Sequence, residues 1–228
     1  MAIIHRTTLT PTKLELLTTW LPSQPWYAGS GPGAKLTRAG GFRLDDPAGE
    51  VGIEFMIVTD AAGGEPVAYH VPMTYRAEPL DGGDGSLIGT TEHGVLGRRW
   101  VYDGLQDPML VGRLVALFRG QAEPQAQSIS DTPDDTVIVQ PMTADVLPSA
   151  RFLAISGKFG TDLQLETAAP GSRLILRVGR ALQAGEGSDA SGGAAASDAG
   201  QPRLSATWAQ PDGTVVRGIL ARERSEAA

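Results

Sequence analysis

The stretch that most constrains the fold is residues 20–29, which read WLPSQPWYAG. Proline disfavours helical geometry at the residue before it, so a helix that enters this stretch must end near Leu21. Two large aromatic residues, Trp26 and Tyr27, then lie in a segment without a regular period. Such rings usually bury over the edge of a core and bond their polar tips locally. The stretch therefore predicts the end of a helix followed by an aromatic anchor.

The residues before this stretch predict a helix that spans 10–21 or starts slightly later. Three leucines at helical spacing give it one apolar face: Leu14, Leu17 and Leu21. Thr10 suits the N-cap and Pro11 the first turn. Thr12 and Glu15 offer a capping box that would start the helix later. The sequence leaves both starts open.

A run of strands is predicted next. Residues 50–59 alternate with one clearly apolar face, which predicts a half-buried strand, and the turn residues 60–65 predict a hairpin to a partner strand at 66–76. Pro72 cannot donate to a ladder, so the partner strand is expected at an edge or with a bulge. His70 lies on the face of the same strand opposite to Tyr69 and is expected to be solvated.

Residues 86–107 form a second dense stretch, and a helix is predicted directly after it. Asp107 suits the N-cap and Pro108 the first turn. The helix is expected to bury one stripe: Leu110, Val111, Leu114, Val115 and Phe118. Gly120 is expected to stop it at C′. Asp103 is expected to cap or bond a loop rather than to act as a base.

The second half predicts short strands at 136–139, 150–156, 161–166 and 173–178, then a hairpin of 204–208 with 215–221 around the turn 210–213. Residues 184–201 contain only Gly, Ala, Ser, Asp, Glu and Gln, which predicts a flexible insertion. The predicted fold class is α+β: a twisted antiparallel sheet packed on the N-terminal helix, a second helix on another face, and a β-rich C-terminal half.

Charge and composition restrict the function classes. The net charge of −7 and a pI near 5.0 argue against nucleic acid and anionic membranes as partners. With no cysteine there is no disulfide, thiolate metal site or catalytic thiol. The N-terminus does not read as a signal peptide, and no window approaches the roughly twenty apolar residues of a membrane helix. A cytoplasmic protein is expected.

Residues 21–27, LPSQPWY, resemble the Leu-Pro-x-Gln-Arg-Trp-[Phe/Tyr] signature in the N-terminal cap of bacterial maltokinases, with Pro25 in place of the usual arginine. Residues 89–103 resemble a second cap motif, Gly-Thr-x-x-His-x-x-Leu-Gly-x-Arg-Trp-Val-Tyr-Asp. Maltokinases phosphorylate maltose with ATP in actinobacterial trehalose and α-glucan (glycogen) metabolism. The resemblance implies a cystatin-like curved sheet embracing a helix over residues 1–125. Residues 136–228 would then be an extension that either folds separately or joins the cap.

The sequence lacks the motifs that a kinase lobe would supply. Phosphoryl transfer needs a phosphate clamp, a catalytic carboxylate and magnesium ligands. No His-Gly-Asp loop, Asp-Phe metal motif or Walker A sequence is present. The three histidines lie in separate segments, so no metal site or cofactor is expected. We therefore expect a cap without catalytic residues.

Three functional hypotheses follow. The first is a non-catalytic module that binds a protein of glucan or trehalose metabolism, such as a maltokinase. Its candidate contact residues are those enriched at binding hot spots, together with one histidine whose favoured interpretation is a bond to its own turn: Trp26, Tyr27, His93, Arg98, Arg99 and Trp100. The second is a glycan or small-molecule binding module that uses exposed Trp26 and Tyr27. The third, a cryptic enzyme of glucan metabolism, is disfavoured by the missing motifs.

Overall fold

The computed structural model describes residues 8–29, 33–129, 131–147, 151–185 and 201–224. Within these ranges the helices are α1 (Lys13–Trp20), α2 (Pro108–Phe118) and the short 3-10 turns η1 (Leu21–Ser23), η2 (Asp84–Ser86) and η3 (Gly104–Gln106). The strands are β1 (Leu9–Thr10), β2 (Leu36–Leu44), β3 (Gly52–Asp60), β4 (Val67–Arg76), β5 (Leu87–His93), β6 (Gly97–Asp103), β7 (Gln125–Ala126), β8 (Ile138–Gln140), β9 (Phe152–Gly157), β10 (Gly160–Glu166), β11 (Arg173–Val178), β12 (Ala181–Leu182), β13 (Arg203–Ala209) and β14 (Val215–Glu223).

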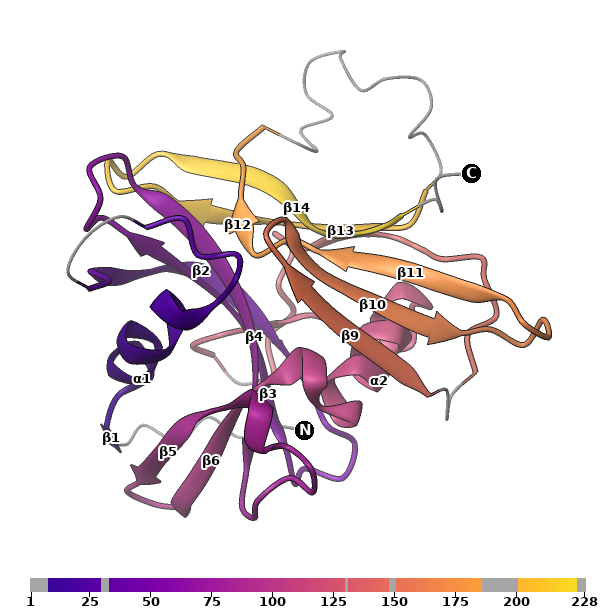
Figure 1. Ribbon diagram of the computed structural model, residues 1–228, viewed down its shortest axis with the longest axis horizontal. Helices are drawn as coiled ribbons and strands as arrows, with labels where there is room; N and C mark the ends of the chain where they lie inside the picture. Colours follow the sequence, from indigo (N-terminus) through magenta and orange to yellow (C-terminus); the bar gives the residue numbers. More distant parts are fainter. Residues whose placement is uncertain (1–7, 30–32, 130, 148–150, 186–200, 225–228) are drawn as a thin grey trace.

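The strands form one antiparallel sheet in the order β1-β5-β6-β4-β3-β2-β13-β14-β11-β10-β9 (Figure 1). Three short strands lie outside this order: β12 pairs with β4, β7 with β2, and β8 with β13. The two halves of the chain join where β2 meets β13, at Gly40 opposite Trp208, and where β12 pairs with β4. A side chain at Gly40 would come within 3.0 Å of the Thr207 carbonyl, so glycine permits this close approach. The α+β class with an antiparallel sheet is confirmed. The cystatin-like arrangement and the division at 125–136 stay predictions.

The sheet is covered on both faces near its middle. Alternate residues of β3 belong to two different cores: Ile53, Phe55 and Ile57 lie in one, and Met56 and Val58 in the other. Helix α2 packs in the first core and α1 in the second, on opposite sides of the molecule in Figure 1. The expectation of a half-buried β3 is therefore wrong, because each face of this inner strand has its own covering layer.

Helix α1 starts at the later of the two sites that the sequence offered. The Thr12 hydroxyl accepts from the Glu15 amide, and the Glu15 carboxylate accepts from the Thr12 amide at 2.7 Å. This capping box satisfies two donors at the helix start, so the alternative start at Thr10 is wrong. Leu17 and Leu21 are fully buried, and η1 ends the helix at the predicted proline-containing turn.

Strand β4 differs from prediction at two residues. It is an inner strand, paired along its length with β3 in regular register, so the expected edge or bulge at Pro72 is wrong. On its other side β12 pairs with residues 68–69 and β6 with residues 73–76, and Pro72 falls between these partners, where no ladder donor is needed. His70 is 0% exposed, so its predicted solvation is also wrong.

Several local signals are confirmed. Asp107 caps α2 by accepting from the Met109 amide, and all five predicted stripe residues of this helix are buried. Gly120 follows the helix with φ of +68°, the left-handed conformation expected at C′. The β13–β14 hairpin turns at Gly213, also with positive φ. Residues 186–200 of the predicted flexible insertion lie outside the described residues. No helix in the described ranges is long and apolar enough to cross a membrane.

Candidate functional site: the Arg180 junction and the hairpin tip

The first motif is folded inward. Trp26 is 2% exposed and belongs to the α1-side core with Leu17 and Leu21. Its ring lies 5.7 Å from Trp20 in an edge-on arrangement and 5.9 Å from Tyr69. Burial over a core is therefore confirmed for this residue. The hypothesis that used an exposed Trp26 is wrong on that point, because the ring is covered by the helix that precedes it.

Tyr27 lies beside Trp26 but keeps its polar tip bonded. Its ring stacks on Tyr69 at 5.5 Å, and its hydroxyl donates to Asp60 at 2.7 Å. Burial and this bond raise the pKa of Tyr27 to about 12. Asp60 also accepts from the Lys35 and Ala62 amides. The Tyr27 hydroxyl is bonded as expected, but its partner is 33 positions away in the chain and is not local. The predicted local bond is also wrong for Trp26, whose Nε1 has no partner among the described residues.

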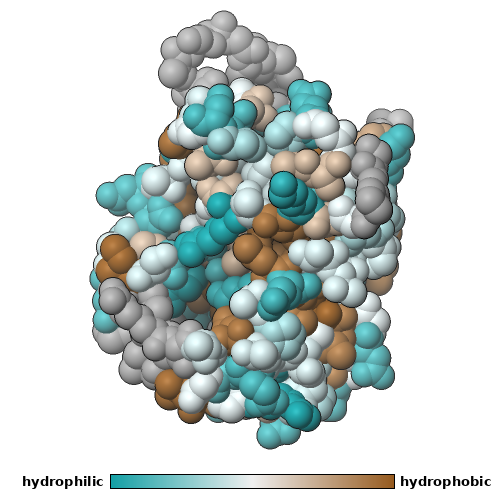
Figure 2. Space-filling model, turned by 90° about the vertical axis from the view of Figure 1, so that its left-hand side faces the viewer, coloured by the Kyte–Doolittle hydropathy of each residue, from teal (hydrophilic) through white to brown (hydrophobic). Residues whose placement is uncertain are grey.

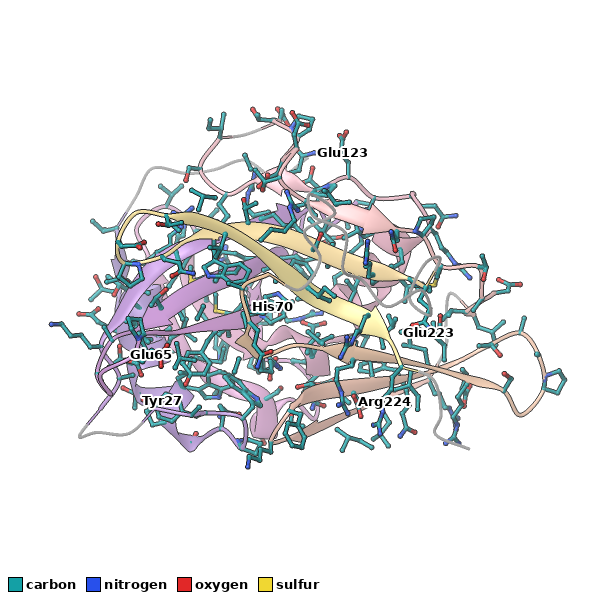
Figure 3. All side chains as sticks on the ribbon, turned by 90° about the horizontal axis from the view of Figure 1, so that it is seen from above. Tyr27, Glu65, His70, Glu123, Glu223 and Arg224 are labelled. Atoms are coloured by element: carbon teal, nitrogen blue, oxygen red, sulfur yellow. The ribbon has the colours of Figure 1, made fainter. Side chains whose placement is uncertain are left out.

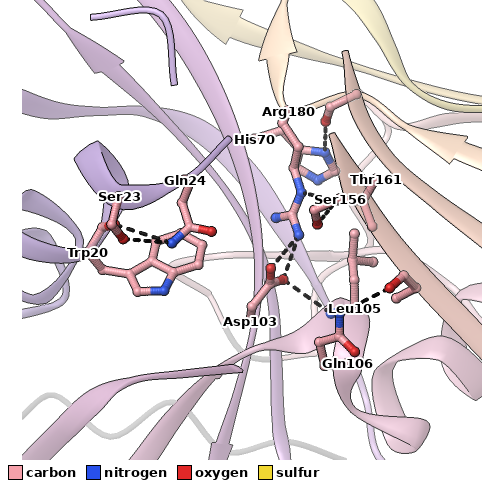
Figure 4. Close-up of polar contacts among 12 residues, drawn as sticks. Trp20, Ser23, Gln24, His70, Asp103, Leu105, Gln106, Ser156, Thr161 and Arg180 are labelled. Carbon is pink, nitrogen blue, oxygen red and sulfur yellow. Dashed lines mark hydrogen bonds and ion pairs between the residues drawn. The ribbon is translucent and has the colours of Figure 1, made fainter. Parts of the chain in front are cut away.

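The second motif is joined to the first by an arginine from the C-terminal half. Arg180, between β11 and β12, is fully buried, and its Nη2 donates to both Asp103 oxygens at 2.7 and 2.5 Å (Figure 4). Its Nε donates to the Thr161 hydroxyl at 3.0 Å. The guanidinium carbon lies 5.0 Å from the centre of the Trp26 ring, within cation–π range. We call this cluster of Trp26, Asp103, Thr161 and Arg180 the Arg180 junction.

His70 borders the Arg180 junction (Figure 4). Its backbone amide donates to the Arg180 carbonyl at 2.8 Å, and its Nδ1 bonds the Gly179 carbonyl at 3.1 Å. Because a carbonyl only accepts, Nδ1 carries a proton, so in the neutral ring Nε2 carries none. Burial, reinforced by the charge of Arg180, lowers the pKa of His70 to about 3. The ring stays neutral and serves as packing against Phe55.

The other predicted residues lie on the β5–β6 hairpin. We call residues 93–99 the hairpin tip. His93 Nδ1 accepts from the Val95 and Leu96 amides at 3.3 and 3.1 Å, so this histidine bonds its own turn. Arg98 is exposed and pairs with Glu92 at 2.9 Å across the hairpin. Val95 and Leu96 are 61% and 45% exposed. The hairpin tip therefore presents apolar and charged side chains together.

Arg99 and Trp100 lead from the hairpin tip into the sheet. Both are half-buried, and Trp100 pairs with Thr90 on β5 and with Arg76 on β4. The next residue, Val101, enters the α1-side core. The structure thus separates the predicted contact residues into two groups. Buried Trp26 and half-buried Tyr27 pack around Tyr69, whereas His93, Arg98, Arg99 and Trp100 lie on the β5–β6 hairpin.

Charged groups inside the sheet were missed by the sequence analysis. Glu54 is 4% exposed and accepts from Lys13 and Tyr75, each at 2.6 Å. These partners outweigh burial and lower the pKa of Glu54. A lone acid in an apolar strand was a usable signal for a buried ion pair. Arg180 carried no such signal, because nothing local indicates which acid it meets.

Three of the buried carboxylates are kept ionised by their surroundings. Burial alone would raise the pKa of Asp46, Glu54 and Asp60, but hydrogen bonds lower all three, and nearby cations also lower the pKa of Asp46 and Glu54. A general acid at neutral pH needs a raised pKa. Among the described residues, no group of three or more His, Asp or Glu side chains could hold a metal ion.

Comparison with protein families gives a match over residues 20–107, to the family described as the maltokinase N-terminal cap domain. The match begins at Trp20 and ends at Asp107, so it contains both motifs. The chain therefore carries a cap-like domain. The matched range is less than half of the 228 residues. It leaves out α2, the strands β7–β14 and Arg180.

Proposed function

We propose that this chain is a non-catalytic, cytoplasmic module that binds a protein partner of maltose, trehalose or α-glucan metabolism, such as a maltokinase or a glucan enzyme. The observation that carries the proposal is the family match, which is to a cap and ends at residue 107. The lowered pKa values of Asp46, Glu54 and Asp60 argue against a general acid among these three residues.

We place the partner contact on the hairpin tip. Trp26 and Asp103, one from each motif, are enclosed by Arg180 and are not open to a partner. Val95 and Leu96, by contrast, are exposed next to Arg98 and Arg99. Figure 2 shows hydrophobic residues near the centre of one face, whereas the β5–β6 hairpin lies at the lower end of the molecule in Figure 1, apart from that central group. Isolated apolar residues are common on surfaces, so the pairing of adjacent apolar residues with arginines is the distinguishing feature.

The test is a calorimetric titration of this protein with a purified maltokinase from the same organism. We expect the Val95→Asp, Leu96→Asp variant to weaken binding by about tenfold or more, because it places charge in the contact. Val215→Asp is the matched control, since Val215 is 66% exposed at the start of β14, far along the sheet order from β5 and β6. Equal binding by wild type and the double variant would exclude the hairpin tip. No binding to maltokinase or to a panel of glucan enzymes would refute the proposed function.

The glycan-binding alternative rests on fewer rings than the sequence suggested. Trp26 is buried, and the Tyr27 hydroxyl is already bonded to Asp60. Half-buried Trp100 is the remaining ring of the predicted set that could stack on a sugar. A change in tryptophan fluorescence with maltose or longer glucans, lost in Trp100→Phe, would favour this alternative. Turnover of ATP with maltose, or of linear glucan, would instead favour an enzyme.

A further inference from the structure

A small pocket of about 290 Å³ lies at the end of the β13–β14 hairpin. Its lining includes residues 201–203, Ile219 and the end of β14. Figure 3 labels Glu223 and Arg224, which lie at that end. Three guanidinium groups and one carboxylate line the pocket: Arg203, Arg222, Arg224 and Glu223. The pocket is therefore basic, although the whole chain carries a net charge of −7.

Two of the three pocket arginines, Arg203 and Arg222, belong to a row of arginines across the sheet. Arg177 on β11 pairs with Arg222 on β14, and Arg222 pairs with Arg203 on β13. Residues directly opposite each other on neighbouring strands point to the same face. Like charges in such positions destabilise a sheet. Three consecutive arginines in one row therefore oppose stability.

The acidic residue in this row, Asp162, already bonds two arginines. Asp162 on β10 pairs with Arg177 and accepts from its Nε and Nη2 at 2.7 and 2.8 Å. The same carboxylate accepts from Arg224 at 2.8 Å. Bonds from both arginines lower the pKa of Asp162, so it stays ionised. Arg222 is exposed, and within the described residues no acidic side chain bonds it. One carboxylate thus serves two arginines, while the middle arginine of the row has none.

We propose that this pocket binds a small soluble anion of the phosphate class, such as a phosphate monoester or pyrophosphate. Guanidinium groups present several N–H donors in a plane and match phosphate oxygens in pairs. The volume lies at the lower end of ligand pockets, about 300 Å³, which suits a small ligand. The acidic surface elsewhere repels polyanions, which disfavours nucleic acid and anionic membranes. The ligand offsets the repulsion within the arginine row. The proposal is independent of the partner contact at the hairpin tip.

The test uses the full chain with sodium pyrophosphate as the probe. Calorimetry should show saturable binding to the wild type, and Arg222→Gln should weaken it by about tenfold or more, because a charged hydrogen-bond donor is lost. Arg222→Gln should also raise the Tm of the protein without anion by about 1–3 °C, because it relieves like-charge repulsion. A purely structural arginine would lower the Tm instead.

Arg173→Gln is the matched control. Arg173 is exposed on the same strand as Arg177 and lies outside the pocket lining. The Arg173→Gln variant should bind pyrophosphate with the same affinity as the wild type. Equal weakening in both variants would show diffuse charge attraction and overturn the site, as would the absence of saturable binding. If the protein sediments with vesicles that contain phosphatidic acid but does not bind pyrophosphate, the pocket binds a lipid phosphate. That result would overturn the proposal of a soluble ligand.

Discussion

Arg180 and Asp103 are 77 positions apart in the chain and form a buried ion pair with two contacts, at 2.7 and 2.5 Å. The side chain of Arg180 is 0% exposed and that of Asp103 is 8% exposed. Asp103 ends β6 inside the matched range, and Arg180 lies well outside it. The cap-like region therefore depends on the C-terminal half for a counter-charge in its interior.

Replacement of Arg180 by methionine should lower the free energy of unfolding by about 3–5 kcal/mol, because it leaves the Asp103 carboxylate buried without a counter-charge. Urea denaturation followed by circular dichroism measures this loss. Arg98→Met is the control, since the Arg98–Glu92 pair is more than half exposed on both sides. Breaking such a surface pair should cost about 0–1 kcal/mol.

The double variant Asp103→Leu, Arg180→Met tests the cause of that loss. Removing both charges avoids an unpaired buried ion, so the double variant should be more stable than Arg180→Met alone. Equal or greater destabilisation would show that packing of Arg180 on Trp26, and not the charge pair, is what stabilises the junction.

Local signals in the sequence predicted much of the fold because they act within a few residues. The capping box at Thr12, the N-cap at Asp107 and the C′ glycine at 120 each depend on neighbours in the chain. Strand β11 was predicted with its observed bounds, Arg173–Val178. Such elements follow from hydrophobic periodicity and from capping and turn residues, which are visible in the local sequence.

Burial on the far side of a strand could not be predicted in the same way. His70 and Met56 lie on the second faces of β4 and β3, and their cover depends on which distant elements pack there. Pro72 was tolerated in an inner strand because β12 and β6 leave its position between them. Arg180 met Asp103 through the same long-range pairing. These outcomes are set by topology, which local patterns do not encode.

Trp26→Ala should destabilise the protein strongly, by about 3–5 kcal/mol, because it removes a buried aromatic side chain. Tyr27→Phe should cost about 1–2 kcal/mol, since only the hydroxyl bond to Asp60 is lost. Thermal and urea unfolding of both variants measure the difference. A stable Trp26→Ala variant with unchanged unfolding would contradict the anchor role and return this residue to the partner-contact hypothesis.

Asp107→Ala should destabilise by about 2–4 kcal/mol, because one carboxylate serves three partners. It caps α2 at Met109, accepts from the Thr74 hydroxyl at 2.7 Å and receives Arg76 at 2.7 Å through two nitrogens. A lone N-cap is worth about 1 kcal/mol, and the buried hydrogen bonds add to it. Thr12→Ala provides the comparison at α1, with an expected loss near 1 kcal/mol. Equal losses in the two variants would mean that the Thr74 and Arg76 contacts contribute nothing.

His70 should make the protein less stable as the pH falls from about 6.5 towards 5. The ordinary pKa of histidine is 6.5, and burial lowers that of folded His70 to about 3. Between these values the unfolded chain binds a proton that the folded protein does not, so stability rises with pH. The stability is complete above pH 6.5 and is lost as the pH falls. The slope approaches about 1.4 kcal/mol per pH unit, or roughly 2 kcal/mol by pH 5.

His70→Gln isolates this effect, because the amide can still donate to the Gly179 carbonyl but does not titrate. The buried carboxylates titrate lower, since the pKa values of Glu54 and Asp60 are reduced from 4.5 and 3.8. Urea unfolding between about pH 5 and pH 7 should therefore give a flatter profile for His70→Gln than for wild type. His93→Gln, which alters the hairpin turn, should keep the wild-type slope. If His93→Gln flattens the profile and His70→Gln does not, His70 is accessible to protons in the folded protein and its enclosure by Arg180 and Phe55 is incomplete.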